Sequence, residues 1–279
     1  MRRGKGLRSK VIVILVISIM VLGPISGLVL AETPAPMFRN NLARTGRSPE
    51  SPPVNNTTLW DYETDDPVKS SPVVSERRVY VGTMGGEILC LDAFTGQRVW
   101  SYRVQGGVES SPAVWEGKVY VGSDDTYVYC LNASDGSLVW STETRGEIKS
   151  SPAVRDGLVY VGSNDFSVHC FDAHDGDEVW TFATGGYVYS SPALFGDTAY
   201  FGSCDGEMYA VNATTGALVW NFTADFCPAS PAIYEDLVIF GAYDGLVHYL
   251  NRTTGREVHK VPLYFAEIYS SAGLFVWRM

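Results

Sequence analysis

The sequence predicts an all-β fold, a β-propeller of four-stranded antiparallel blades, from three features that recur together. A Ser-Ser-Pro tripeptide begins at Ser70 and returns every forty residues, the last time one residue early as Ala229-Ser230-Pro231. A Val-Tyr-Val-Gly segment or a close variant follows each copy, first at 79–82. Five tryptophans keep the forty-residue spacing: Trp60, Trp100, Trp140, Trp180 and Trp220. A repeat of this length, with a turn every dozen residues or so, is typical of propeller blades.

The second repeat illustrates how four strands fit into one blade. A first strand is expected over 108–114, and Pro112 inside it places this strand at the margin of its sheet, because proline cannot donate to a central ladder. Gly136 supplies the positive φ that the last turn of the blade needs. Nothing in the repeats has a helical period, and a solenoid of parallel strands needs a shorter repeat. The other three strands are expected over 118–122, 127–132 and 138–143.

The repeats predict five complete blades and partial N- and C-terminal strands of a further blade. Residues 58–63 match the fourth strand of a blade, and residues 268–272 match a first strand. The sequence ends at Met279, before a second strand of that blade forms. An unfilled blade leaves sheet edges exposed. We therefore expect an open or strained ring, as in a truncated copy of a longer protein or in a ring that a second chain closes.

The first 31 residues have the order of charge, apolar run and small residues that marks a secretory signal. Five basic residues precede the apolar run 11–22, Gly23 and Pro24 follow it, and cleavage is expected after Ala31. The stretch 11–31 is also nearly long enough to span a bilayer, so a retained membrane anchor is the alternative. Residues 32–56 are expected to form an extended lead-in, and residues 57–279 the propeller. We expect a secreted or cell-surface protein.

The charge of the chain argues against nucleic acid as a partner. The full sequence has a net charge of −10. Removal of residues 1–31 removes five basic and no acidic residues, which leaves 16 basic against 31 acidic residues and a net charge of −15. A surface this acidic repels phosphate backbones. Contact with a membrane is expected only through an uncleaved N-terminal segment.

The turn before each tryptophan carries the pattern that identifies the repeat. Residues 91–96 read Leu-Asp-Ala-Phe-Thr-Gly, with Trp100 four residues on, and similar segments span 132–140, 172–180 and 212–220. The pattern resembles the pyrroloquinoline-quinone (PQQ) repeat of quinoprotein-dehydrogenase-like propellers, over residues 57 to 272, and residues 37–49 resemble the lead-in of that family. The fifth copy, 251–259, has lost the tryptophan. The resemblance implies that the five tryptophans dock against the turn of the neighbouring blade.

The resemblance covers the fold and does not extend to a cofactor site. Quinoprotein dehydrogenases hold the quinone and Ca²⁺ with carboxylates, an arginine and a stacking tryptophan on long insertions, whereas the turns of this chain are short. The sequence also has no Cys-x-x-Cys-His haem motif. Because a shared fold is a weak argument for a shared function, we expect no cofactor, no metal and no catalytic residue.

The repeated aspartates and the histidines favour structural roles. His169, His174, His248 and His259 have no metal-pair spacing and are expected at the surface or in seams between blades. Aspartate also recurs in the turn after the second strand, where a ring of carboxylates could hold a cation. Aspartate in such turns usually accepts hydrogen bonds from its own backbone, which is the interpretation we favour. These aspartates are Asp124, Asp125, Asp165, Asp205 and Asp244.

The candidate recognition site is a ring of variable positions. The residue before each Ser-Ser-Pro changes from blade to blade in an otherwise nearly constant context. Blade geometry puts it near the entry of the innermost strand, around the mouth of the central channel. Repeats keep fold-determining residues alike and vary recognition residues, although the alternative that nothing selects these positions stays open. The candidate ring comprises Lys69, Glu109, Lys149, Tyr189, Pro228 and Tyr269.

Six asparagines begin an Asn-x-Ser/Thr sequon. Three of them replace the aspartate of the PQQ-like turn. In an exported protein of a glycosylating organism they are candidate N-glycosylation sites, and elsewhere they are turn residues. The six are Asn55, Asn56, Asn132, Asn212, Asn221 and Asn251.

The cysteines fall into two groups. Cys90, Cys130 and Cys170 occupy one repeat position. Because packed sheets lie about 10 Å apart and a disulfide needs Cα atoms within about 7 Å, these three are expected to be buried free thiols. Cys204 and Cys227 lie in connections on the same face of neighbouring blades. They are the pair that could form a disulfide.

These observations predict a non-catalytic extracellular or cell-surface scaffold that binds protein or glycan through one propeller face. A quinone-dependent dehydrogenase, or a relic of one, is the alternative from another class. An envelope-assembly factor resembling the outer-membrane barrel-assembly propeller is a third possibility. The absence of a lipobox cysteine and of long loops counts against it.

Overall fold

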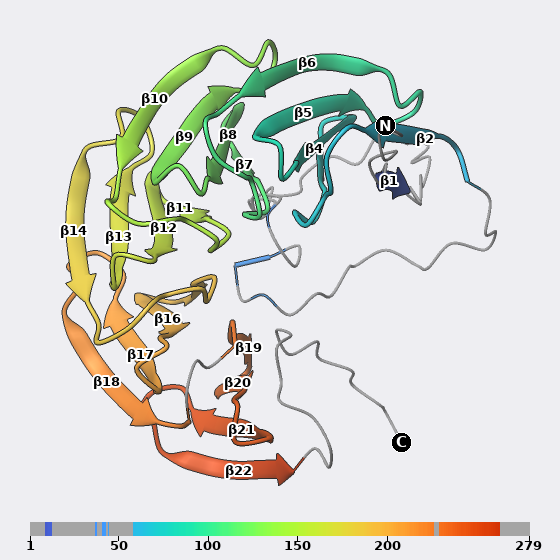
Figure 1. Ribbon diagram of the computed structural model, residues 1–279. Helices are drawn as coiled ribbons and strands as arrows, with labels where there is room; N and C mark the ends of the chain where they lie inside the picture. The colour runs from blue at the N-terminus through green and yellow to red at the C-terminus, as the bar shows by residue number, and fades with distance from the viewer. Residues whose placement is uncertain are drawn as a thin grey trace, which may run out of the picture.

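The computed structural model describes residues 9–12, 37, 41–42, 44, 58–225 and 229–262. All regular structure among them is β-strand, and the strands form five four-stranded antiparallel sheets and one strand pair. The sheets follow one another along the chain and around an arc (Figure 1). The predicted propeller of five complete blades is therefore confirmed.

Each blade contains four strands in sequence order. Blades one and two comprise β3 (Val73–Ser75), β4 (Arg78–Gly82), β5 (Glu87–Asp92), β6 (Arg98–Arg103), β7 (Ala113–Trp115), β8 (Lys118–Gly122), β9 (Tyr127–Asn132) and β10 (Leu138–Glu143). Blades three to five comprise β11 (Ala153–Arg155), β12 (Leu158–Ser163), β13 (Ser167–Asp172), β14 (Glu178–Ala183), β15 (Ala193–Phe195), β16 (Thr198–Gly202), β17 (Glu207–Asn212), β18 (Leu218–Thr223), β19 (Ala232–Tyr234), β20 (Leu237–Gly241), β21 (Leu246–Asn251) and β22 (Glu257–Pro262).

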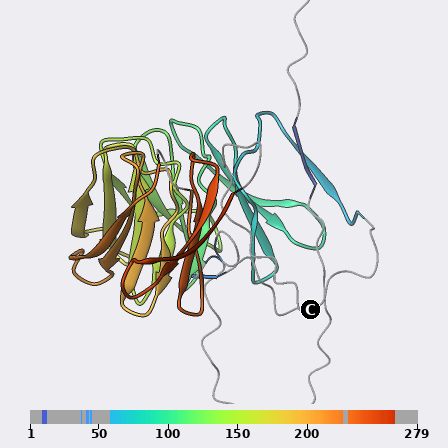
Figure 2. The same cartoon turned by 90° about the horizontal axis from the view of Figure 1, so that it is seen from below.

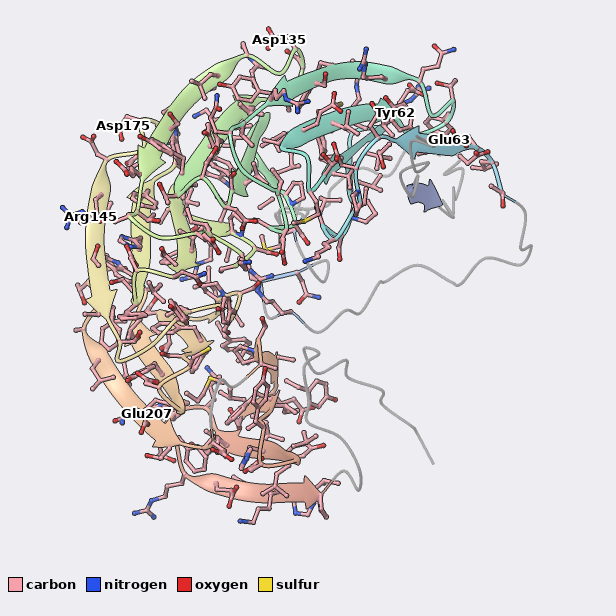
Figure 3. All side chains as sticks on the ribbon, viewed as in Figure 1. Tyr62, Glu63, Asp135, Arg145, Asp175 and Glu207 are labelled. Carbon is pink, nitrogen blue, oxygen red and sulfur yellow. The ribbon has the colours of Figure 1, made fainter. Side chains whose placement is uncertain are left out.

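The first strand of every blade lies at the inside of the arc and the fourth at the outside (Figure 1). The second and third strands are buried along most of their length, as in β4 and β5, because neighbouring blades cover both of their faces. The fourth strand alternates between exposed and buried positions, and in β10 the buried residue is Trp140. Figure 3 shows side chains filling the spaces between the sheets, with Asp135 and Asp175 at the outer rim. The core is therefore a series of seams between blades.

The first strands are shorter than the sequence predicts. The strand expected over 108–114 is β7, Ala113–Trp115, which begins after Pro112. It does lie at the sheet margin, as predicted. Before it, the Ser111 N–H donates to Ser151 Oγ of the next blade at 3.0 Å instead of joining the ladder of its own sheet. Pro112 has no N–H with which to extend the ladder.

The same serine bond links every pair of neighbouring blades. The N–H of the second serine in each Ser-Ser-Pro copy donates to the hydroxyl oxygen of its equivalent in the next blade. The donor–acceptor distances run from 2.8 to 3.0 Å. Because these serines are mostly buried, each bond satisfies a backbone donor that the short first strand leaves outside the ladder. The series runs through Ser71, Ser111, Ser151, Ser191 and Ser230.

A tryptophan fastens each blade to the following one near the outer rim. Trp100 Nε1 of blade one donates to the carbonyl oxygen of Ala133 in blade two at 2.9 Å. Its ring lies on Gly136, where an added Cβ would come within 2.6 Å of the ring. The same hydrogen bond, at 2.9–3.1 Å, is made by Trp60, Trp140, Trp180 and Trp220. The docking that the PQQ-like repeat implies is thus present at all five tryptophans.

Strand β2 (Asp61–Thr64) lies beside the first blade as the continuation of the outer rim (Figure 1). It covers residues 61–63, the second half of the strand expected over 58–63. Its described partner is β1 (Ser9–Ile12), which pairs with it antiparallel, Ser9 opposite Thr64. Tyr62 packs against the core of blade one, and Figure 3 shows Tyr62 and Glu63 at that end of the arc. The C-terminal strand expected over 268–272 lies outside the described residues.

Three described residues of the lead-in contact the propeller itself. Met37 joins a buried cluster with residues of blades two to four. The Leu194 N–H donates to the Leu42 carbonyl at 2.8 Å. Arg44 is fully buried, and its guanidinium donates to backbone carbonyls of blades three and four, including Ser151 O at 3.0 Å and Pro192 O. The lead-in thereby satisfies carbonyls near the first strands.

The side view shows the blades side by side, with turns and connections at their two ends (Figure 2). Within the described ranges the arc does not close, because β2 and blade five stand at its two ends (Figure 1). The same part of the chain contains no helix long and apolar enough to cross a membrane.

The tryptophan seam predicts the effect of two matched glycine substitutions. Gly136 and Gly117 both have positive φ, 75° and 69°, but an added Cβ meets Trp100 at Gly136 and nothing within 4 Å at Gly117. We expect Gly117→Ala to cost about 1 kcal/mol through backbone strain alone. Gly136→Ala should cost about 1–3 kcal/mol more, because Trp100 has to move. Thermal and urea unfolding of both variants measure the difference, and equal losses would contradict the docking role of the tryptophan.

Candidate functional site

One end of the propeller brings variable residues together, and we call it the connection face. It carries the connections between blades and the turns between the second and third strands. The two are held together by backbone hydrogen bonds, such as Asp124 N–H to Gly107 O at 2.9 Å and Asn164 N–H to Glu147 O at 2.9 Å. The same pairing recurs between Cys204 and Tyr187 at 2.8 Å. Side chains of one connection therefore meet those of the next blade's turn.

Three members of the predicted ring meet in a charged cluster on this face. Lys69 Nζ lies 2.8 Å from Glu109 Oε1, and Lys149 Nζ lies 3.6 Å from the same oxygen. Lys149 Nζ also lies 3.4 Å from Glu147 Oε2 and 4.0 Å from Asp124 Oδ1. Two ammonium groups thus face three carboxylates.

The pKa values in the cluster follow from burial and from these pairs. Burial alone would raise the pKa of Glu109, but Lys69 and Lys149 outweigh it and lower that pKa. Burial raises the pKa of Asp124, against the opposing charge of Lys149. Burial alone would lower the pKa of Lys149, but Asp124, Glu109 and Glu147 raise it. The lysine therefore stays protonated among the carboxylates.

An aromatic patch, formed by Phe166, Tyr187 and Tyr189, adjoins the charged cluster. The ring centroids of Phe166 and Tyr187 lie 5.0 Å apart in an edge-on arrangement, and those of Tyr187 and Tyr189 lie 5.8 Å apart. All three side chains are exposed, by 44%, 44% and 42%. Glu147 joins the patch to the cluster, since its carboxylate lies 3.4 Å from Lys149 Nζ and accepts from the side-chain amide of Asn164, in the turn of Phe166, at 3.3 Å.

The structure therefore brings together part of the predicted ring. Lys69, Glu109 and Lys149 form the charged cluster, and Tyr189 belongs to the patch beside it. Pro228 and Tyr269 lie outside the described residues. Sequence analysis missed the contributions of Glu147, Asp124, Phe166 and Tyr187 to this face. Glu147 and Tyr187 occupy the same repeat position, two residues before the ring position. This position also varies between blades, and that variation is the signal that could have placed both residues on the connection face.

Asp125 and Asp205 act in their own turns, as the favoured interpretation expects, whereas Asp124 belongs to the charged cluster. Asp125 accepts from the Tyr127 N–H at 3.2 Å, from the Tyr129 hydroxyl at 2.9 Å and from the Gln105 N–H at 2.8 Å. Asp205 repeats this arrangement in blade four. Within the described ranges no three His, Cys, Asp or Glu residues are grouped to hold a metal ion.

Two histidines occupy the position of Tyr129 in other blades. His169 of blade three lies 2.9 Å from Asp165 and 3.0 Å from Glu178 through its two ring nitrogens. His248 of blade five repeats the contacts with Asp244 and Glu257. Both rings are buried and tie the turn to the fourth strand of their own blade. His248 also meets Phe222 of blade four, with ring centroids 5.6 Å apart, in the seam where a histidine was expected. His174 and His259 are exposed, as predicted.

The described sequons lie away from the connection face, with three of them in the turns between third and fourth strands. In these turns the asparagine accepts hydrogen bonds from the residues that follow, as Asn212 does from the Thr214 and Thr215 N–H groups. Asn132 and Asn251 do the same. Asn221 lies in β18 and donates to Glu207. Asn55 and Asn56 lie outside the described residues, and glycosylation stays a prediction.

Cys90, Cys130 and Cys170 are free and buried, as predicted. Burial raises the thiol pKa to about 11 for Cys90 and to about 12 for Cys130 and Cys170, which keeps all three protonated and inert near neutrality. Cys204, on the connection face, is disulfide-bonded. Cys227, with which it was predicted to pair, lies outside the described residues.

Fold and repeat together define a β-propeller of PQQ-like repeats. Residues 75–277 match the family described as "Beta-alanine-activating enzyme, beta-propeller", and the chain belongs to this family. No curated protein matches the chain at a significant level.

Solved structures share the fold at low sequence identity. BamB from Moraxella catarrhalis is 22% identical with a TM-score of 0.66, over 74% of this chain and 67% of that chain. The quinohemoprotein alcohol dehydrogenase ADHIIG from Pseudomonas putida HK5 is 20% identical with a TM-score of 0.74, over 81% of this chain and 47% of that chain. The quinohemoprotein alcohol dehydrogenase from Comamonas testosteroni is 20% identical with a TM-score of 0.72, over 88% and 52%. The chain thus spans about half the length of these two dehydrogenases.

The buried His169 predicts a pH-dependent contribution to stability. Burial alone would lower its pKa, but Asp165 and Glu178 outweigh burial and raise it. A raised pKa in the folded state means that His169 stabilises the fold fully below its unfolded pKa of about 6.5 and loses this contribution as pH rises through the folded pKa. His169→Tyr copies the residue of blades two and four and does not titrate in this range. We expect the melting temperature of the wild type, relative to this variant, to be higher at pH 5.5 than at pH 9 by roughly 2 °C or more.

Tyr209→Phe is the control for that measurement. It removes the equivalent hydrogen bond to Asp205 at 2.9 Å in blade four without removing a group that titrates between pH 5.5 and 9. Its melting temperature relative to wild type should stay constant across this range. A constant difference for His169→Tyr as well would show that the ion pairs of His169 do not contribute.

Proposed function

We propose that this protein is a non-catalytic, extracytoplasmic scaffold that binds a protein partner through the connection face. The observation that carries the proposal is the contrast between constant and variable positions of the repeat. The tryptophan and serine bonds between blades are the same at every described seam. The residues that vary meet on one face, as the charged cluster and the aromatic patch. A glycan bound at this face is the alternative.

The composition of the face supports a protein partner. Exposed aromatic side chains next to charged pairs are typical of protein interfaces, whose central aromatic residues contribute most of the binding energy. The order of charge, apolar run and small residues over 1–31 supports export.

A quinone-dependent dehydrogenase is the rival function, since the chain shares its fold with quinohemoprotein alcohol dehydrogenases. The charged residues of the connection face argue against it, because Glu109 pairs with both Lys69 and Lys149, so that these charges already neutralise one another. The two buried histidines are likewise engaged by carboxylates within their own blades.

The rival function is tested by reconstitution. The full chain is incubated with pyrroloquinoline quinone and Ca²⁺, desalted, and scanned for quinone absorbance, with a quinoprotein dehydrogenase carried through the same steps as a positive control. We expect no quinone to remain with the protein. Retained quinone in stoichiometric amount would overturn the proposal of a non-catalytic scaffold.

The proposed face is tested by site-specific photo-crosslinking in cells that make the protein. A photoreactive residue replaces Lys69 on the connection face in one variant and Ser134 at the opposite end in another. Both side chains are exposed. We expect a discrete cross-linked protein from position 69 and none from position 134. The same products from both positions, or products from position 134 alone, would contradict the proposed face.

A further inference from the structure

Phe166 occupies a backbone position that suits glycine. The last residue of the turn between second and third strands has a positive φ in every blade, 81°, 79°, 69°, 92° and 76° for Gly86, Thr126, Phe166, Gly206 and Gly245. Glycine adopts this conformation freely, whereas a bulky side chain is strained there. Blade three thus carries a phenylalanine at a position where three of the other blades carry glycine.

Burial does not compensate this strain. The Phe166 side chain is exposed by 44%, and its ring meets Tyr187, which is itself exposed. Strained residues that persist at the surface are concentrated at binding sites. The backbone strain at Phe166 therefore points to a ligand that binds against its ring and the adjoining rings.

The backbone beneath the aromatic patch is fixed in advance. The Phe166 carbonyl accepts from the Thr184 N–H at 2.8 Å and from the Thr184 hydroxyl at 2.9 Å. The Tyr187 carbonyl accepts from the Cys204 N–H at 2.8 Å. A backbone fixed before binding loses little conformational entropy when a ligand binds, which favours affinity.

The charges around the patch are complementary to a cation. Glu147 lies on the turn of Phe166, since its carbonyl accepts the Asn164 N–H and its carboxylate accepts the Asn164 side-chain amide at 3.3 Å. The Glu147 side chain is half exposed. With Glu109 and Asp124, Glu147 gives the charged cluster three carboxylates against its two lysines. The whole chain is also acidic, with a net charge of −10. Aromatic faces attract cations, and a guanidinium both stacks on such rings and pairs with a carboxylate.

We propose that Phe166, Tyr187 and Tyr189, with Glu147 at their edge, form a docking platform for an arginine-bearing segment of the protein partner. The proposal rests on the proposed function, of which it names the partner chemistry. The guanidinium stacks on the exposed rings, and the carboxylate of Glu147 accepts its N–H groups. Phe166 is retained, at a cost to stability, for this contact.

The test measures affinity and stability together. Binding of a fluorescein-labelled (Gly-Arg)₅ peptide to the full chain is followed by fluorescence polarisation, with (Gly-Glu)₅ as the opposite-charge probe. Phe166→Gly should weaken binding of the arginine peptide roughly three- to tenfold, while its melting temperature stays equal to wild type or rises by about 2–4 °C as strain is relieved. Thr126→Gly is the matched control, since it relieves the same strain in blade two. It should leave the affinity unchanged.

Two further measurements keep the proposal falsifiable. Tyr187→Ser removes an exposed ring without changing the strained turn. It should weaken binding of the arginine peptide as much as Phe166→Gly does, even if Phe166→Gly loses stability. Neutral oligosaccharide, offered as cellohexaose, should not compete with the peptide. Equal peptide affinities for wild type, Phe166→Gly and Thr126→Gly, or competition by cellohexaose, would overturn the proposed platform. The proposed function is judged separately, by the cross-linked protein at position 69, and survives these outcomes if that product forms.

Discussion

The seams between blades depend on a tryptophan N–H that donates to a carbonyl oxygen of the next blade, and in most of them a tyrosine hydroxyl donates to the same oxygen. In the first seam, Ala133 O accepts from Trp100 Nε1 and from the Tyr80 hydroxyl, and the tryptophan ring lies flat against Gly136. The indole, the phenol and the turn have to be correctly placed at the same time. Because the seams hold most of the buried apolar surface, this contact sets the spacing on which the burial of every second and third strand depends.

The second constraint lies at the inner end of each blade, where the serine bonds join equivalent positions of successive blades. They engage the backbone before the first strand, so this backbone runs across the seam instead of along its own sheet. Each connection is thereby laid against the turn of the following blade. With both ends of the seam held by repeated bonds, the side chains of the connections are free to vary, and they meet on the connection face.

The sequence predicted the blade count, the strand order and the docking tryptophans, because each depends on residues that recur at a fixed spacing. It also placed Lys69, Glu109 and Lys149 in one ring, since equivalent residues of successive blades must lie side by side. It failed for the start of the first strand, where a bond between blades outcompeted the ladder. It also missed Phe166, because a backbone conformation with positive φ has no signature in a single phenylalanine.

By itself, the sequence determined the propeller, its period, the recurring tryptophans and the buried free thiols at one repeat position. Each of these follows from a local pattern repeated along the chain. Only the tertiary structure decided that Glu109 bridges two lysines, that Glu147 lies on the turn of Phe166, and that Arg44 of the lead-in binds carbonyls of blades three and four. The distances in these contacts depend on how the blades pack around the arc, which no local pattern encodes.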